Sequence, residues 1–330
     1  MKHQILALAV AALSFTACSN EDNISQDYLA DTPIKLNVSV DEPTTRAGYS
    51  NTDKPTGFVL VVLHDINGYD KYNYKVWAEG EDKNWKTYDL AKYSNDRIKE
   101  DVTMLWANMN DNVTVYAISD VDYLAKINKH PTDQTTPDAL KKADFLAMPL
   151  TPVAPTQDGI NVEFKHTMSK INLTIELGSE YEFTQEDVDT KITDVKIDGS
   201  KVEAFYHINT SNYDPQFQFS GHSGDPTPIS PYRTGTTPYS KTNGVITKAS
   251  ATYEAILIPQ TIESGKFTVS FKVDGKLYEW AYNNEAGLTL DPSTAYTLKL
   301  IAGDDKVQPA SFSVAAWNPG NGDGEKKETD

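Results

Sequence analysis

The sequence has a single cysteine, Cys18, among its 330 residues. One cysteine cannot form a disulfide within the chain, so the fold depends on packing and the thiol calls for another explanation. Arginine is almost as rare, because Arg46, Arg97 and Arg233 are the only three. Beyond the N-terminal segment no apolar run approaches the roughly 20 residues that a membrane-spanning helix needs. A disulfide-stapled fold and a helical membrane protein are therefore excluded.

Positive charge is also scarce, since 47 Asp and Glu residues outnumber 30 Lys and Arg and give a net charge of −17. Nucleic acid and anionic membrane surfaces would be repelled, so we expect neither as a partner. The six histidines are scattered without metal-site spacing, and the sequence has no Gly-rich phosphate loop or nucleophile elbow. We expect no metal, no cofactor and no enzymatic activity.

The N-terminus has the layout of a lipoprotein export signal. Residues 1–17 begin with Lys2 and His3, continue through an apolar run and end in small residues directly before Cys18. This order is typical of a secretory signal peptide. Acylation of Cys18 would explain the isolated cysteine, and the acyl chains would hold the protein at a membrane. Residues 18–32 are polar and acidic, as in a stalk, so the lipid is the expected membrane contact.

The rest of the chain has an almost entirely β pattern. Residues 33–40 alternate between apolar and polar, which is typical of a half-buried strand. Residues 58–63 are apolar throughout, as in a central strand covered on both faces. One short helix is expected over residues 137–145, with Thr136 as its cap. In the second half, Asp198-Gly199 and Asp274-Gly275 each predict a β-hairpin turn.

Composition divides the chain into two halves of domain size. Prolines and small polar residues cluster around residues 149–158 and indicate a boundary. We predict a β-sandwich over residues 33–155, a second over residues 156–317 and a disordered tail at residues 318–330. The segment 209–250 is rich in Ser, Thr, Pro and Gly, and we expect it to be mostly loop.

Arg46 lies between the first predicted strand and the body of the first domain, in the sequence Thr45-Arg46-Ala47. A cut there would free residues 33–46. The apolar side chains of that strand are Ile34, Leu36, Val38 and Val40. At about 1.5–3 kcal/mol each, their loss would cost about 6–12 kcal/mol, which is comparable to the stability of a whole domain. The alternative is an ordinary surface arginine.

Four short motifs resemble the fimbrillin family of Bacteroidales. They are His166-Thr-Met-Ser-Lys170-Ile-Asn-Leu, Ile192-Thr-Asp-Val-Lys-Ile, Ile256-Leu-Ile-Pro-Gln260 and Val314-Ala-Ala-Trp317-Asn-Pro. The resemblance implies an all-β fold of two transthyretin-like β-sandwich domains in tandem. It implies a structural or adhesive subunit of a cell-surface fimbria (pilus), exported as an outer-membrane lipoprotein.

The same resemblance implies how such a subunit matures and assembles. An Arg-specific surface protease cuts after Arg46 and leaves Ala47 as the new N-terminus. The first strand then departs, and a strand from another fimbrial subunit fills the groove. The candidate donor, residues 310–317 with Phe312, Val314 and Trp317, is equally the last strand of its own domain. Shaft, tip or accessory, and anchor positions all stay open.

A monomeric outer-membrane lipoprotein that binds glycans is the alternative. Aromatic residues that could stack on sugar rings are Trp77, Trp85, Trp106, Tyr69, Tyr72 and Tyr74. Aromatics at alternating strand positions more often belong to a core or to cross-strand pairs. Segment 209–250 is the expected contact for a host protein or glycan because loops are exposed.

Overall fold

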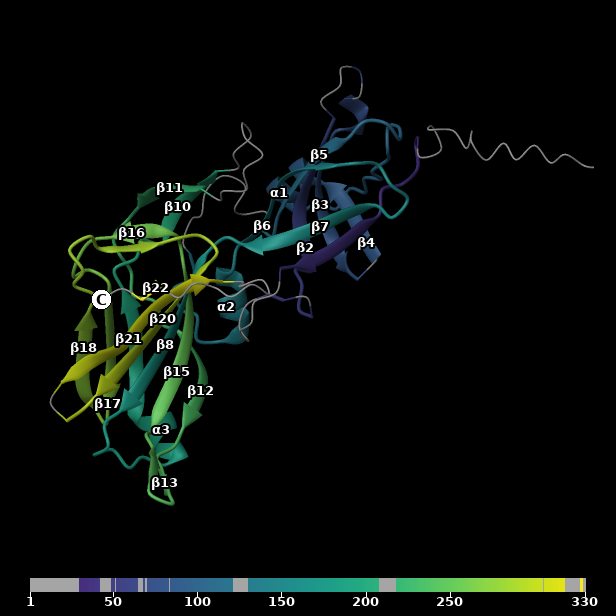
Figure 1. Ribbon diagram of the computed structural model, residues 1–330. Coiled ribbons are helices and arrows are strands. Elements are labelled where there is room, and N and C mark those ends of the chain that lie inside the picture. Colours follow the sequence, from purple (N-terminus) through teal and green to yellow (C-terminus); the bar gives the residue numbers. More distant parts are fainter. Residues whose placement is uncertain are drawn as a thin grey trace, which may run out of the picture.

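The computed structural model describes residues 30–41, 49–50, 52–64, 68, 70–82, 84–120, 130–207, 218–304, 306–317 and 327–328. Two β-rich regions make up this part of the chain (Figure 1). The N-terminal region, residues 30–166, carries a seven-stranded sheet. The C-terminal region, residues 167–317, carries a larger and a smaller sheet with three two-stranded ribbons. In the described part of the chain no helix has both the length and the apolar character needed to cross a bilayer.

The N-terminal sheet has a single parallel edge strand. Its strands are β1 (Leu36–Val40), β2 (Gly57–Leu63), β3 (Tyr74–Glu81), β4 (Asn84–Asp89), β5 (Val113–Ile118), β6 (Leu146–Val153) and β7 (Ile160–His166). Their order in the sheet is β1-β7-β6-β5-β2-β3-β4. Strand β1 runs parallel to β7, and the other neighbours are antiparallel. Strand β7 lies beyond the boundary expected at residue 155, and the chain enters the next sheet at Ser169.

This sheet curves around its own core. The rings of Phe58 in β2 and Phe164 in β7 lie 5.3 Å apart, although β5 and β6 separate the two strands in the sheet. In a flat sheet the strands would be about 14 Å apart. Strand β2 is covered on both faces, as its apolar run predicted: Phe58 points into this core, and Val59 into a second core shared with the C-terminal region.

The C-terminal region packs two sheets face to face. Its strands are β8 (Ser169–Leu177), β9 (Ile192–Asp198), β10 (Glu203–His207), β11 (Gln218–Ser223), β12 (Tyr232–Thr237), β13 (Ser240–Thr242), β14 (Val245–Thr247), β15 (Ser250–Leu257), β16 (Gln260–Ile262), β17 (Thr268–Val273), β18 (Lys276–Ala281), β19 (Leu288–Leu290), β20 (Thr294–Ala302), β21 (Val307–Ala316) and β22 (Lys327–Glu328). The larger sheet has the order β12-β15-β8-β20-β21-β22, and the smaller has β18-β17-β9. Side chains of both sheets, such as Leu173 and Phe271, share one core.

Two expectations about local structure need correction. The segment 209–250 is not mostly loop: its described part contains β11, β12, β13 and β14. Within the tail, β22 pairs with β21, and the other tail residues lie outside the described part. The ribbons β10–β11 and β13–β14 and the pair β16–β19 complete the region.

The described part of the chain contains three α-helices rather than one, so the fold is mostly β and not all-β. They are α1 (Leu90–Asp96), α2 (Pro137–Ala143) and α3 (Gln185–Lys191), with a 3-10 turn at Asp70–Tyr72. Helix α2 confirms the prediction, and Thr136 Oγ1 accepts a hydrogen bond from the backbone N of Ala139. Helix α3 begins with a capping box in which Thr184 and Asp187 bond reciprocally.

A shared core and a set of hydrogen bonds join the two regions. Val59, Ile118 and Phe145 of the first region pack with Ile258 and Trp317 of the second. The side chain of Gln134 accepts from the backbone N of Ile256 at 2.8 Å and donates to its carbonyl at 2.7 Å. The buried His130 donates from Nε2 to the same carbonyl at 2.7 Å. The segment around residues 130–136 therefore fastens the first region to β15.

Candidate functional site

Strand β1 is bonded on one side to β7 alone. The register runs from Leu36 opposite Ile160 to Val40 opposite Phe164. Two backbone hydrogen bonds close the ends of this ladder: Ile160 N donates to Lys35 O at 2.9 Å, and Asp41 N to Phe164 O at 2.8 Å. In the described part of the chain no strand pairs with the other edge of β1. Only one ladder therefore holds this strand.

The residues before β1 make a second set of backbone contacts. Ile34 N donates to Met104 O at 2.9 Å, and Trp106 exchanges bonds with Asp31 and Thr32 at 2.8 and 3.0 Å. The hydroxyl of Tyr72 donates to Asp31 Oδ1 at 2.8 Å. The segment 31–41 is thus bonded at its start to residues 104–106 and along β1 to β7.

The apolar side of this segment is built into the core. The four side chains predicted to be buried are Ile34, Leu36, Val38 and Val40, with exposed fractions of 9%, 4%, 6% and 1%. They belong to the same cluster as Phe58, Trp106 and Phe164. If β1 left, these aromatic residues and the backbone of β7 would line an open apolar groove.

A polar residue and a glycine fix how β1 lies against its neighbour. Asn37 Nδ2 donates to the carbonyl of Asp158 at 2.9 Å and to Asn161 Oδ1 at 3.1 Å. Gly159 has φ of +88°, and a Cβ there would lie 2.3 Å from the carbonyl oxygen of Lys35. Because only glycine tolerates both conditions, the turn before β7 can approach β1 closely.

The candidate donor segment forms the C-terminal half of β21 and the residue after it. Strand β21 pairs antiparallel with β20 along its length. Phe312 and Val314 pack partly buried against the C-terminal core. Trp317 is 2% exposed, stacks on His166 at 4.4 Å between ring centroids and donates its backbone N–H to Ser293 O at 2.7 Å. This residue therefore anchors β21 at the junction of the two regions.

A buried polar cluster surrounds that anchor. His166 Nδ1 lies 2.9 Å from Asp144 Oδ1, and the other carboxylate oxygen of Asp144 accepts from the backbone N of Tyr49 at 3.1 Å. Lys170 Nζ lies 3.1 Å from Glu254 Oε2 and 5.7 Å from the Trp317 ring. Burial lowers the pKa of Lys170, and the nearby Glu254 partly offsets this effect.

Burial also changes the pKa of Tyr49, whose backbone N–H bonds Asp144. Burial raises the pKa of Tyr49 to about 12, and the carboxylate of Asp144 adds to the effect. Sequence reasoning missed this cluster. The available signal was a histidine and a lysine four residues apart, His166 and Lys170, at the end of one strand and the start of the next.

A profile for fimbrillin-like proteins matches residues 62–317 of the chain. The chain belongs to the fimbrillin-like family. A protein assigned to cell adhesion from Bacteroides ovatus is similar in structure, with a TM-score of 0.51 at 13% identity, covering 86% of this chain and 97% of that chain. At this identity the likeness shows the fold alone.

Two further solved structures were compared with the fimbrillin-like chain. A fimbrial protein of Bacteroides vulgatus has a TM-score of 0.44 at 13% identity, covering 86% of this chain and 99% of that chain. The C-terminally truncated tip fimbrial protein Mfa3 of Porphyromonas gingivalis has a TM-score of 0.44 at 9% identity, covering 87% and 100%. A search of curated protein sequences finds no match.

The proposed modification sites of this fimbrillin-like protein, Cys18, Arg46 and Ala47, lie outside the described residues. The other two arginines differ in their surroundings. The guanidinium of Arg233 donates to the carbonyls of Asp189 at 3.0 Å and Ile192, and so caps the end of α3. Arg97 follows α1 with φ of +56° and is exposed. Arg97 is therefore the described arginine that an arginine-specific protease would reach more easily.

The aromatic residues considered for sugar binding mostly belong to the fold of the fimbrillin-like protein. Trp106, Tyr72 and Tyr74 are buried in the N-terminal core. Trp77 stacks on Tyr93 at 4.8 Å. Trp85 packs edge-on against Phe58 at 5.0 Å and donates from Nε1 to Asp82 O at 2.8 Å. Tyr69 lies outside the described residues. The described rings thus do not form an exposed stacking platform, which removes the main support for the glycan-binding alternative.

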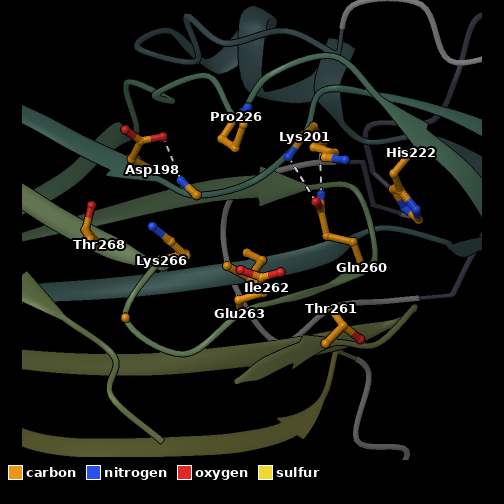
Figure 2. Close-up of a pocket in the computed structure, with 12 residues that line it drawn as sticks. Asp198, Lys201, His222, Pro226, Gln260, Thr261, Ile262, Glu263, Lys266 and Thr268 are labelled. Carbon is orange, nitrogen blue, oxygen red and sulfur yellow. Dashed lines mark hydrogen bonds between the residues drawn. The ribbon is translucent and has the colours of Figure 1, made fainter. Parts of the chain in front are cut away.

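A hollow of about 580 Å³ lies in the C-terminal region, beside β16 and the turn that follows β9 (Figure 2). Gln260 holds one wall in place, because its side chain exchanges two 2.9 Å hydrogen bonds with the backbone of Lys201. The lysines Lys201 and Lys266 are balanced by Asp198 and Glu263. Among its described lining residues there is no Trp, Tyr or Phe that could stack on a sugar ring.

Metal binding also finds no support in the described residues. No group of three or more His, Cys, Asp or Glu side chains within this part of the chain could hold a metal ion.

Proposed function

We propose that this fimbrillin-like protein is a subunit of a cell-surface fimbria that accepts a strand from another subunit in place of β1. In this proposal Cys18 carries the lipid that holds the precursor at the outer membrane. An arginine-specific protease cuts after Arg46, and residues up to Arg46 are released. We further propose that the two β-rich regions are the tandem transthyretin-like sandwiches that the family resemblance implies.

The observation that carries the proposal is the position of β1 at a sheet edge, with three core side chains on the strand and a fourth, Ile34, just before it. An edge strand can leave without passing through a neighbour. Its departure exposes backbone donors and acceptors on β7 together with apolar surface. Such a groove is completed by an added strand, whose main chain supplies affinity and whose alternate side chains supply specificity.

The position of Trp317 supports an accepting role at a tip or accessory site rather than a shaft role. A shaft subunit must hand on a strand of its own. Here the end of β21 is held by the stacking of Trp317 on His166 and by its bond to Ser293. Freeing β21 would expose Lys170 and the shared core. We therefore propose that the chain accepts a strand without donating β21.

The test is limited digestion of residues 19–330 with an arginine-specific protease, followed by N-terminal sequencing. The expected first product begins at Ala47, and its β1 segment exchanges with an added strand peptide that has the sequence of residues 31–41. Arg46→Lys should prevent that product. The matched control is Arg97→Lys, which should leave it unchanged.

Two outcomes would count against the proposal. A first cut that yields Ile98 as the new N-terminus would mean that the exposed Arg97 is the processing site. The second is a cut at Arg46 after which labelled peptide 31–41 does not bind to the protein. The chain would then be processed without exchanging a strand.

A further inference from the structure

The hairpin of β13 and β14 is ordered by its turn but buries nothing. Ser240 pairs with Thr247, and Thr242 with Val245. The turn residues Asn243 and Gly244 have φ of +52° and +81°, as a tight hairpin turn requires. Every residue of both strands is exposed. The hairpin therefore extends from the body with both faces in water.

Its apolar side chains have no role within the monomer. Val245 is 68% exposed and Ile246 is 46% exposed. These neighbours in β14 point to opposite faces of the ribbon, so neither face packs on the body. An isolated two-stranded hairpin is at best marginally stable in water and gains stability when a face is covered. Branched aliphatic residues on both faces indicate an element that packs against something else.

The sequence segment that contains the hairpin carries charge of one sign. Residues 226–250 contain Arg233, Lys241 and Lys248 and no Asp or Glu, although the chain as a whole carries a net charge of −17. The hairpin lies at the end of the C-terminal region that is remote from the N-terminal sheet (Figure 1). Arg233 and Lys248 are already paired with Asp189 and Glu176 of the same chain. Lys241, exposed on β13, is the cation that the hairpin presents outward, and an acidic surface would complement it.

An acidic ridge lies at the same end of the molecule. Residues 180–190 contain five acidic side chains and no Lys or Arg: Glu180, Glu182, Glu186, Asp187 and Asp189. Tyr239, next to the hairpin, donates its backbone N–H to Phe183 O at 2.9 Å, and Gln185 Nε2 donates to Thr236 Oγ1. The ridge and the hairpin are thus neighbours. Tyr181 and Phe183 are partly exposed on the ridge and supply apolar surface.

We propose that this end of the molecule is a two-fold contact between two copies of the chain. The hairpin of each copy packs on the acidic ridge of the other. Self-complementary pairing needs both halves of the contact on one surface patch, and here they are adjacent. Lys241 then meets the ridge carboxylates, while Val245 and Ile246 pack against its aromatic rings. The contact is remote from β1 and goes beyond strand exchange.

The test uses uncleaved residues 19–330, so that its result does not depend on processing at Arg46. Sedimentation velocity over a concentration series should show a monomer–dimer equilibrium. Val245→Asp with Ile246→Asp should raise the dimer dissociation constant about 100-fold or more, because two aliphatic side chains lose their burial. Ile98→Asp is the matched control. Ile98 is 52% exposed directly after α1 in the N-terminal region, remote from this end, and its replacement should leave the equilibrium unchanged.

A charge exchange tests the orientation of the contact. Lys241→Glu and Glu186→Lys should each weaken the dimer, and the two together should restore it. Rising salt should weaken the wild-type dimer, because partly exposed charges are screened. A wild-type chain that stays monomeric throughout the series would overturn the proposal. So would hairpin variants that dimerise like the Ile98→Asp control, or a charge exchange whose effects simply add.

Discussion

The two regions of the molecule each contain a strand of the same pattern in different surroundings. Strand β1 and the two residues before it have apolar residues at four alternate positions from Ile34 to Val40, and β8 has them from Ile171 to Leu177. Each runs parallel to a later strand of its own region, β1 to β7 and β8 to β20. Strand β8, however, has β15 bonded along its other side, whereas β1 is the edge of its sheet. Of these two strands, β1 is therefore the one whose position is compatible with the proposed exchange.

The difference teaches that sequence pattern and exchangeability are separate properties. The segment 34–40 and β8 each bury four alternate apolar side chains, so their removal would cost a similar loss of apolar burial. The central strand β8 is bonded on both sides, so its departure would also break two ladders. The edge position, together with the proposed cleavage after Arg46, is what would make β1 replaceable and leave β8 in place.

The largest effect is expected when β1 is removed altogether. A variant that starts at Ala47 should lose about 6–12 kcal/mol from the N-terminal region, because four core side chains and a ladder are gone. Urea unfolding followed by tryptophan fluorescence should then show an early transition for this region, which holds Trp77, Trp85 and Trp106.

Adding a strand in trans is the control for that variant. A peptide of residues 31–41 should move the early transition back toward higher urea. The same peptide with Leu36→Asp and Val38→Asp should not, because charged side chains cannot enter the apolar groove without a large cost. If the N-terminal region of the Ala47 variant unfolded at the same urea midpoint as in the wild type, β1 would contribute little to its stability. The contrast drawn between β1 and β8 would then not hold.

A pair of single substitutions compares the two strands directly. Leu36 and Leu173 occupy equivalent positions and are 4% and 1% exposed. Leucine-to-alanine changes in cores cost about 2–5 kcal/mol, more where the surroundings cannot relax. We expect about 4–5 kcal/mol for Leu173→Ala and about 2–3 kcal/mol for Leu36→Ala in urea unfolding. Equal costs, or a larger cost at Leu36, would mean that β1 is held as rigidly as β8.

Much of the strand pattern could be predicted from the sequence because burial and turn chemistry are local. The alternation at β1, the apolar run of β2 and the Asp274-Gly275 turn between β17 and β18 are all confirmed. The Asp198-Gly199 hairpin is wrong. Strand β9 pairs with β17, and β10 with β11. Gly199 instead has φ of +101° because the turn lies against the carbonyl of Lys266, a tertiary contact that no local signal reveals.

Of the candidate site, only the buried apolar residues of the first strand could be predicted from the sequence. The four buried residues between Ile34 and Val40 follow from periodicity, whereas the pairing of β1 with β7 and its edge position depend on sheet order. The stack of Trp317 on His166 joins residues 151 positions apart in sequence and required the structure. Arg46 stays a prediction, because nothing in the described part of the chain tests its cleavage.

Acidification should reveal how the two regions are joined. Burial lowers the pKa of His130 to about 4 from its ordinary 6.5, with a small opposing effect from the bond to Ile256 O. A depressed folded pKa means that the stabilisation is complete above pH 6.5 and is lost as pH falls toward 4. The loss is about 3 kcal/mol, from 1.36 kcal/mol per pKa unit. Urea unfolding between pH 7 and pH 4 measures it.

The control for this titration is a change at a histidine that does not join the regions. His130→Asn should flatten the pH dependence, while His222→Asn in the C-terminal region should leave it as in the wild type. Carboxylates add their own acid sensitivity to all three proteins, so the difference between the slopes is the informative quantity. Identical slopes for His130→Asn and the wild type would mean that His130 is not held neutral in the fold.

The smallest effect is expected for the polar face of β1. It shows whether hydrogen bonds from this face help the apolar face to hold the strand in place. Asn37 bonds the carbonyl of Asp158 and the side chain of Asn161, so Asn37→Ala should cost about 1 kcal/mol. That change corresponds to roughly five-fold faster release of β1 once the chain is cut after Arg46. Release of a labelled N-terminal fragment measures the rate. Ser39→Ala, two residues along the same side of β1, is the matched control and should leave it unchanged. Equal release from both variants would mean that the side chain of Asn37 does not help to hold the strand.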